Sequence, residues 1–370
     1  FPSTNRVDIK NPDVLFKAVI DSDNVPEQEL RAIYYNSKAL NQGTRNEKRI
    51  TRWKDGVDYT PLQDKEKTGS IAVFAFNANG ASDAEFMRAW VCKNINSGIR
   101  HLLSELTQYP SIQFGLEQAF LSLNSKDKFE LFSSDFTKGK EAIPINGLVW
   151  MGDKSFMKSQ IKEKLASGFS CIKMKIGAID FNTEVELLSS IRKEFSSKEI
   201  ELRVDANGAF LPENALEKLK ILSELDLHSI EQPIKQGQLQ EIAKLCEQTP
   251  LPIALDEELI GVFSEEDKRK VIATVNPQYI ILKPSLIGGF AGSKEWINLA
   301  EENNSGWWIT SALESNIGLN AIAQFTYTLQ SKIPQGLGTG SMFTNNIQSP
   351  LEVKKGTLVY NKNLDWNFKI

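Results

Sequence analysis

Five apolar segments of this sequence each end in an ionisable residue, and they follow one another at nearly constant spacing. The residues at these ends are, in chain order, Lys175, Asp205, Glu231, Asp256 and Lys283. Successive ends lie 30, 26, 25 and 27 residues apart, which suits one strand, one helix and two turns. In a parallel β/α barrel all strands end on the same face, where the active site lies. The spacing therefore predicts that five charged side chains meet in one pocket.

Three of these residues are carboxylates, one from each of three consecutive predicted strands. A single aspartate at a strand end is more often a helix cap or a solvated side chain. Carboxylates that are brought close together repel one another unless a cation neutralises them, and Mg²⁺ prefers hard oxygen ligands of this kind. We therefore predict that Asp205, Glu231 and Asp256 bind Mg²⁺, with Mn²⁺ as the alternative ion.

The lysines favour proton-transfer chemistry beside such a metal. Lys173 and Lys175 are two residues apart on a predicted strand, so their side chains point to the same side. The barrel interior is the better side, because Ile172 and Met174 then face the helices. Neighbouring ammonium groups and a divalent cation lower a lysine's pKa, which makes it a usable base near neutral pH. Lys283 would approach the opposite face of a substrate. Together, these lysines and the metal-binding carboxylates favour a reaction that abstracts a proton next to a substrate carboxylate.

Strands and helices alternate from about residue 141 to residue 345. Apolar runs predict strands at 145–150, 171–176, 201–205, 228–231, 252–255, 279–283, 307–311 and 334–338. Helical periodicity predicts helices at 155–167, 182–195, 212–224, 237–248, 264–273, 291–303 and 315–329. This alternation is typical of a parallel sheet in the α/β class. The number of strands favours a closed (β/α) barrel over 141–345, carrying the catalytic site.

The first part of the chain lacks this alternation. A strand-like run at 71–76 is followed by helical stretches at 84–107 and 113–124, so residues 1–140 are predicted to form a separate α+β capping domain. The tail, residues 346–370, has short apolar runs separated by turn formers. It is predicted to form short strands that complete the capping domain.

The composition shows no bias towards nucleic acid or membranes. The net charge is −4, and no basic cluster is interleaved with aromatic residues. No apolar run approaches the roughly 20 residues that a membrane span needs, and no signal-peptide pattern opens the sequence. Cys92, Cys171 and Cys246 are odd in number and far apart, which favours a reducing compartment. We expect a cytoplasmic enzyme with a small-molecule carboxylate substrate, without a nucleic-acid partner or membrane association, and of undetermined oligomeric state.

The charged strand ends resemble those of the enolase superfamily, in particular the o-succinylbenzoate synthases of its muconate-lactonising-enzyme subgroup. That subgroup carries K-x-K on the second strand, D/E/D ligands on strands three to five and a lysine on strand six. Residues 283–289 match the K-P-x-x-x-G-G/S segment typical of these synthases, and 309–319 are similar to their S-S-x-E-S-x-x-G-L element. Residues 231–233 read E-Q-P, where many relatives have E-E-P or E-Q-P. The resemblance implies a modified TIM barrel of the enolase type.

The resemblance also implies an activity. It would be the Mg²⁺-dependent syn dehydration of 2-succinyl-6-hydroxy-2,4-cyclohexadiene-1-carboxylate to o-succinylbenzoate, a lyase step of menaquinone biosynthesis. Lys175 would abstract the α-proton, with the metal stabilising the enediolate, and then protonate the departing hydroxyl. Lys283 would stabilise the enolate from the opposite face, and Lys173 would tune Lys175.

Four further residues would contact the substrate by the same resemblance. Thr310, Ser311 and Gly336 match positions near its succinyl end, and Asn207 lies close to the ligand Asp205. The first 90 residues depart from the family pattern, because the glycine- and glutamate-containing segment of the capping loop is not found there.

Alternatives remain open at this point. An N-succinylamino acid racemase would use the same lysines on opposite faces of its substrate. Dipeptide epimerases carry an acidic D-x-D on strand eight, which 336–341 lack, and mandelate-racemase-like enzymes need a histidine on strand seven, where neither His101 nor His228 lies. The glycines of 336–340 would suit a phosphate-binding barrel. From another class, a catalytically silent barrel would serve as a binding protein.

Overall fold

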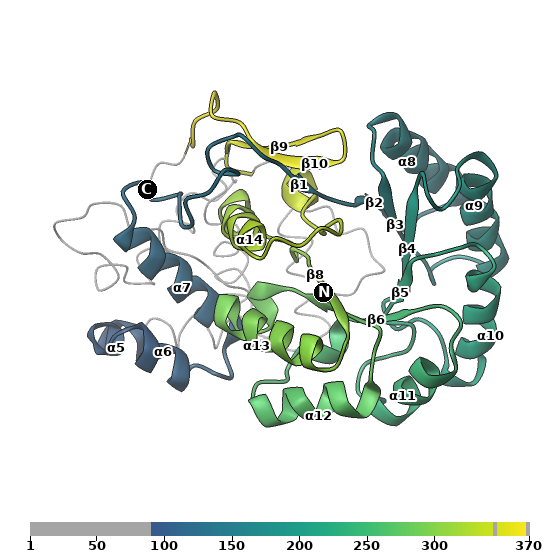
Figure 1. The fold of residues 1–370 in the computed structure, drawn as a ribbon, viewed down its shortest axis with the longest axis horizontal. Coiled ribbons are helices and arrows are strands. Elements are labelled where there is room, and N and C mark those ends of the chain that lie inside the picture. Colours follow the sequence, from purple (N-terminus) through teal and green to yellow (C-terminus); the bar gives the residue numbers. More distant parts are fainter. Residues whose placement is uncertain (1–89, 343–345, 368–370) are drawn as a thin grey trace, which may run out of the picture.

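The main feature of the structure, a computed structural model that describes residues 90–342 and 346–367, is a seven-stranded parallel sheet. Its strands follow one another in sequence order, and helices α8 to α12 lie along its outer side in Figure 1. The strands are β2 (Gly147–Val149), β3 (Cys171–Lys175), β4 (Glu201–Asp205), β5 (Ser229–Glu231), β6 (Ile253–Leu255), β7 (Tyr279–Leu282) and β8 (Gly306–Ile309).

The helices alternate with these strands as the sequence predicts. Their bounds, like those of the seven strands, differ from the predicted ones by at most two residues. Side chains of Asp153, Asp180 and Ser264 cap α8, α9 and α12 by accepting hydrogen bonds from backbone N–H groups of the first turn. The helices are α8 (Lys154–Ala166), α9 (Phe181–Glu194), α10 (Pro212–Ser223), α11 (Leu239–Gln248), α12 (Glu265–Val275), α13 (Gly289–Glu302) and α14 (Asn316–Thr328).

Gln335 and Gly336, which follow α14 in the sequence, link the two ends of the sheet. Gln335 forms a parallel bridge with Ile145, just before β2, and Gly336 forms one with Thr310, just after β8. The strand predicted at 334–338 is present only as these two bridges. They close the sheet into the barrel that the sequence predicts.

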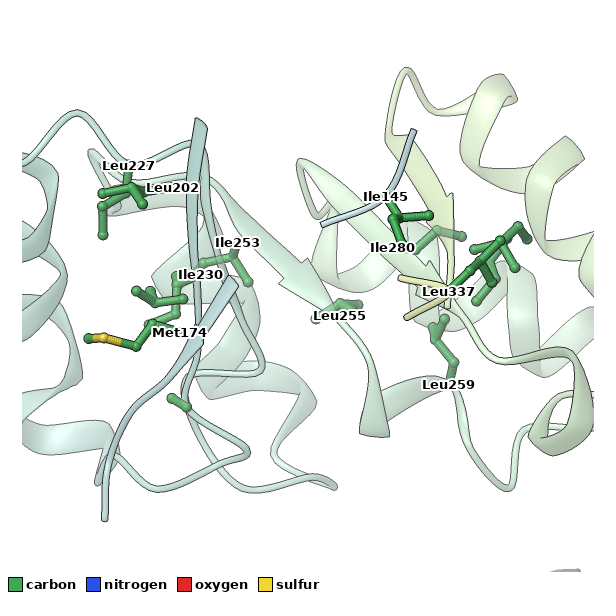
Figure 2. Close-up of a cluster of buried hydrophobic side chains, with 14 of the residues drawn as sticks. Ile145, Met174, Leu202, Leu227, Ile230, Ile253, Leu255, Leu259, Ile280 and Leu337 are labelled. Atoms are coloured by element: carbon green, nitrogen blue, oxygen red, sulfur yellow. The ribbon is translucent and has the colours of Figure 1, made fainter. Parts of the chain in front are cut away.

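Side chains alternate between the helix layer and the barrel interior along each strand. Met174, Leu202 and Ile230 belong to the apolar core between sheet and helices, and Figure 2 shows them on one side of the strands. Because neighbouring strand residues point to opposite faces, Lys173 and Asp205 point to the interior. The alternation places the charged strand ends inside the barrel.

The part of the chain just before the barrel is helical. It contains α5 (Cys92–Asn94), η3 (Ile95–Ser97), α6 (Ile99–Glu105) and α7 (Pro110–Asn124). The prediction of one helix over 84–107 is wrong in its described part, because the 3₁₀ turn η3 and Gly98, whose φ is 84°, separate α5 from α6. Helix α7 begins three residues before its predicted start. Pro110 lies in its first turn, where the N–H that proline lacks would have no partner within the helix.

The tail forms a small antiparallel sheet, as predicted. Strands β9 (Leu351–Lys354) and β10 (Thr357–Tyr360) form a hairpin, and β10 also pairs with β1 (Ile143–Pro144). The strand predicted at 71–76 lies outside the described residues. None of the helices in the described part of the chain has both the length and the apolar character of a membrane span.

Candidate active site

Lys173 lies among the carboxylates at the C-terminal ends of the strands. Its ammonium donates to Glu231 Oε2 at 2.6 Å and to Asp205 Oδ2 at 3.1 Å. The three side chains are buried, with exposed fractions of 11% for Lys173, 1% for Asp205 and 2% for Glu231. They meet because β3, β4 and β5 are parallel neighbours in a register that sets Lys175 beside Asp205 and Asp205 beside Glu231.

Lys175 extends from the last position of β3 to the end of β4. Its ammonium donates to Asp205 Oδ2 at 2.9 Å and to Asn207 Oδ1 at 2.6 Å. Its Nζ also lies 5.6 Å from the centroid of the Trp150 ring, which comes from the loop after β2. Asp205 is held on its other oxygen, since Oδ1 accepts the backbone N–H of Asn207 at 3.0 Å.

Lys283 approaches the carboxylates from the other end of the strand series. It follows β7 directly, and its ammonium donates to Asp256 Oδ2 at the end of β6. Asp256 is buried, whereas the Lys283 side chain is 18% exposed. Lys175 and Lys283 come from β3 and from the end of β7, which are separated by three strands, and their approach to opposite faces of a substrate stays a prediction.

Charges within the site shift its pKa values in opposite directions. Burial lowers the pKa of Lys173, but the contacts with Asp205 and Glu231 outweigh burial and raise it above its ordinary value. Burial raises the pKa of Asp205, and Lys173 and Lys175 outweigh it and hold that pKa below its usual range. Burial and the charge of Asp205 raise the pKa of Glu231 to about 8. For Lys173 the carboxylates thus outweigh the mutual lowering expected between neighbouring lysines.

The three carboxylates suit a cation in their chemistry. Within 90–342 and 346–367, no three His, Cys, Asp or Glu side chains converge closely enough to form a metal-ligating group. Asp205, Glu231 and Asp256 instead pair with lysines. Burial is the largest cause of the raised pKa of Glu231, so the ionised form of this carboxylate is poorly stabilised, and a divalent cation among these oxygens would stabilise it.

Three predicted substrate contacts lie together where β8 meets the closing residues. The hydroxyl of Thr310 donates to the carbonyl of Gly336 at 2.9 Å, and the hydroxyl of Ser311 donates to the same carbonyl at 3.2 Å. A Cβ on Gly336 would lie 2.1 Å from Thr310 Oγ1, so only glycine fits there. Both hydroxyls thus help to close the barrel, and their contact with substrate stays a prediction.

Two residues near the site were not predicted as site residues, although one of them, Gln232, belongs to the E-Q-P segment. Gln232 is fully buried, and its side-chain oxygen accepts the backbone N–H of Asp256 at 3.2 Å, which holds that carboxylate's backbone in place. Glu257 accepts a hydrogen bond from Asn207 Nδ2 at 2.9 Å. Glu257 follows a predicted ligand in the sequence, but nothing there distinguishes it from a solvated loop carboxylate.

Comparison with known proteins places the barrel among characterised enzymes. Residues 157–363 match the family described as enolase C-terminal domain-like. The chain is 56% identical over 251 residues to an o-succinylbenzoate synthase of Desulfotalea psychrophila, which is 68% of each protein. The crystal structure of MenC from Desulfotalea psychrophila superposes with a TM-score of 0.66 at 41% identity, covering 94% of this chain and 85% of that one.

The first part of the chain is similar to a different protein. Residues 1–106 match the family described as restriction endonuclease EcoRII, N-terminal. The chain is 40% identical over 93 residues to the type II restriction enzyme EcoRII of Escherichia coli, which is 25% of this chain and 22% of that enzyme. The two family matches therefore cover separate parts of the sequence.

Proposed function

Because the chain belongs to the enolase C-terminal domain-like family, we propose that it is a lyase acting as an o-succinylbenzoate synthase. The reaction is the syn dehydration of 2-succinyl-6-hydroxy-2,4-cyclohexadiene-1-carboxylate in menaquinone biosynthesis. The observation that carries the proposal is the 56% identity to a synthase over 68% of the chain. The two lysines that enter one buried carboxylate group from different strands support it.

We propose that Asp205, Glu231 and Asp256 hold Mg²⁺, which enzymes of the enolase superfamily generally use. The three side chains come from consecutive strands and are each at most 2% exposed. When bound, the ion supplies positive charge beside the substrate carboxylate, where negative charge develops during proton removal.

Proton transfer is assigned to Lys175. Its amine takes the proton from the ring carbon that bears the carboxylate, and the C–H electron pair is delocalised onto that carboxylate. The pair then forms the new ring double bond as the C–O bond to the ring hydroxyl breaks, and the same ammonium returns the proton to the leaving oxygen, so water departs on the same face. Lys283 lies on the other side and stabilises the developing negative charge, while Lys173 holds Asp205 and Glu231 in place.

The direct test is Mg²⁺-dependent turnover of the cyclohexadiene carboxylate by the purified chain. The same preparation is assayed for racemisation of N-succinyl amino acids, which would use both lysines as bases. Fast dehydration with little racemisation supports the synthase. The reverse result would move the activity to the racemase, and no turnover of either substrate would leave a silent barrel.

A second candidate function concerns residues 1–106. Their similarity to a restriction enzyme, whose substrate is DNA, favours DNA binding by this part of the chain. That would contradict the expectation that the protein has no nucleic-acid partner. Fluorescence anisotropy with a labelled duplex tests it: binding that persists in a chain lacking residues 1–106 would exclude these residues as the DNA-binding part.

Two broader expectations also stay proposals. Residues 1–140 and the tail 346–370 would form the α+β cap over the barrel, of which α5 to α7 and the β1-β10-β9 sheet are described. We also propose a cytoplasmic location, which cell fractionation with a tagged chain would test.

A further inference from the structure

Glu257 is a carboxylate next to the metal-ligand series but outside it. It begins the short 3₁₀ helix η4 (Glu257–Leu259), directly after Asp256. Its Oε1 accepts a hydrogen bond from Asn207 Nδ2 at 2.9 Å. Its Oε2 is buried and makes no hydrogen bond with any described residue. The mechanism above gives this carboxylate no task.

Asn207 joins Glu257 to Lys175. Its Oδ1 accepts from Lys175 Nζ at 2.6 Å while its Nδ2 donates to Glu257. An ammonium can only donate and an ionised carboxylate can only accept, so the amide between them has one orientation. The backbone of Asn207 is also held, because its N–H donates to Asp205 Oδ1 at 3.0 Å and its φ is 43°, in the left-handed region.

We propose that Glu257 is a positioning residue that acts through Asn207 to hold the amine of Lys175 in place for proton transfer. This inference rests on the proposed function. Proton transfer requires the amine within hydrogen-bond reach of the carbon-bound proton, and small displacements of a reacting group cost large factors in rate. Hydrogen bonds in a chain also polarise one another, so the charge of Glu257 strengthens the acceptor that Asn207 offers to Lys175.

The first test compares kcat and KM among four variants and one control variant at saturating Mg²⁺. Glu257→Ala removes the acceptor and should lower kcat by about 100-fold with KM changed by less than about threefold. Glu257→Gln keeps an oxygen acceptor for Asn207 Nδ2 and should restore kcat to within about fivefold of the wild type. Asn207→Ala should lose about as much as Glu257→Ala, and the double variant should lose no more than either. The exposed Glu247→Ala is the control and should behave as wild type.

A wild-type kcat in Glu257→Ala, or additive losses in the double variant, would overturn the inference. A second readout does not depend on the substrate: the rate of reductive methylation of Lys175 by formaldehyde and cyanoborohydride, followed by mass spectrometry. Releasing the amine from its partner should raise that rate several-fold in Glu257→Ala but not in Glu257→Gln. If the wild type dehydrates nothing, the proposed function fails, whereas an unchanged methylation rate is what refutes the role of Glu257.

Discussion

The carboxylate of Glu117 accepts a hydrogen bond from the backbone N–H of Ala291 at 2.9 Å, and from that of Phe290 beside it. Glu117 belongs to α7, before the barrel, and the two N–H groups belong to the first turn of the barrel helix α13. A Cβ on Gly289 would lie 2.0 Å from Glu117 Oε2. The φ of Gly289 is 71°, in the left-handed region, so glycine is required at this position. The glycines at 288 and 289 thus leave room for the Glu117 carboxylate, which caps α13.

Glu117 makes stability depend on pH. Burial, only partly offset by the two backbone N–H groups, raises its pKa from the ordinary 4.5 to about 7. Between these values the folded state holds a proton that the unfolded chain has lost. This group's contribution is therefore fully present below about pH 4.5 and is lost as the pH rises to about 7, by at most about 1.4 kcal/mol per unit.

We expect Glu117→Gln to remove this part of the pH dependence. The free energy of unfolding, measured with urea from about pH 5 to 8, should fall less steeply in the variant than in the wild type. The exposed Glu105→Gln on α6 is the control and should keep the wild-type slope. Parallel slopes for wild type and Glu117→Gln would mean that Glu117 titrates normally in the folded state.

The lysines should show unequal losses of activity. Lys175→Ala removes the base and should lower kcat by roughly 10²- to 10⁴-fold, whereas Lys283→Ala removes charge stabilisation and should cost about 10²-fold. Exposed Lys244, which pairs with Glu241 on α11, serves as the control through Lys244→Ala. Circular dichroism of each variant separates loss of chemistry from loss of fold. Appreciable turnover by folded Lys175→Ala would remove it as the base.

The carboxylates should differ from surface acids in their effect on metal binding. Glu231→Gln keeps the shape of the side chain but removes the charge, so Mg²⁺ affinity measured by calorimetry should fall at least about 10-fold. Glu241→Gln, on the exposed side of α11, should leave the affinity unchanged. An unaltered dissociation constant in Glu231→Gln would contradict its assignment as a ligand.

The sequence predicts the barrel well because its signal is local. In β4 the apolar Leu202 and Val204 alternate with charged residues, and the predicted bounds of that strand agree with the structure. The contact between Asn207 and Glu257 spans 50 residues and depends on the left-handed backbone of Asn207, which no periodicity reveals. The apolar run at 334–338 predicts a full closing strand, but only the bridges of Gln335 and Gly336 form, because pairing at this point is limited to one residue on each side of the gap.

A last prediction concerns Arg203, which lies on β4 two residues before Asp205 and is 1% exposed. Its Nε donates to Glu201 at 2.7 Å, its Nη1 donates to the carbonyl of Pro334 at 3.0 Å, and its guanidinium lies 4.3 Å from the centroid of the Trp308 ring. These contacts tie β4 to β8 and to the closing segment across the barrel interior.

Arg203→Ala should therefore destabilise the fold by about 2–5 kcal/mol, since it removes the ionic partner of Glu201 and leaves Trp308 beside a cavity. The matched variant is Arg203→Met with Glu201→Gln, which fills the space and removes the orphaned charge. It should recover most of the loss in urea unfolding, because replacing a buried pair by packed neutral groups is often nearly neutral. Equal destabilisation of both variants would show that the shape of the guanidinium over Trp308, rather than its charge pairing, stabilises this part of the barrel.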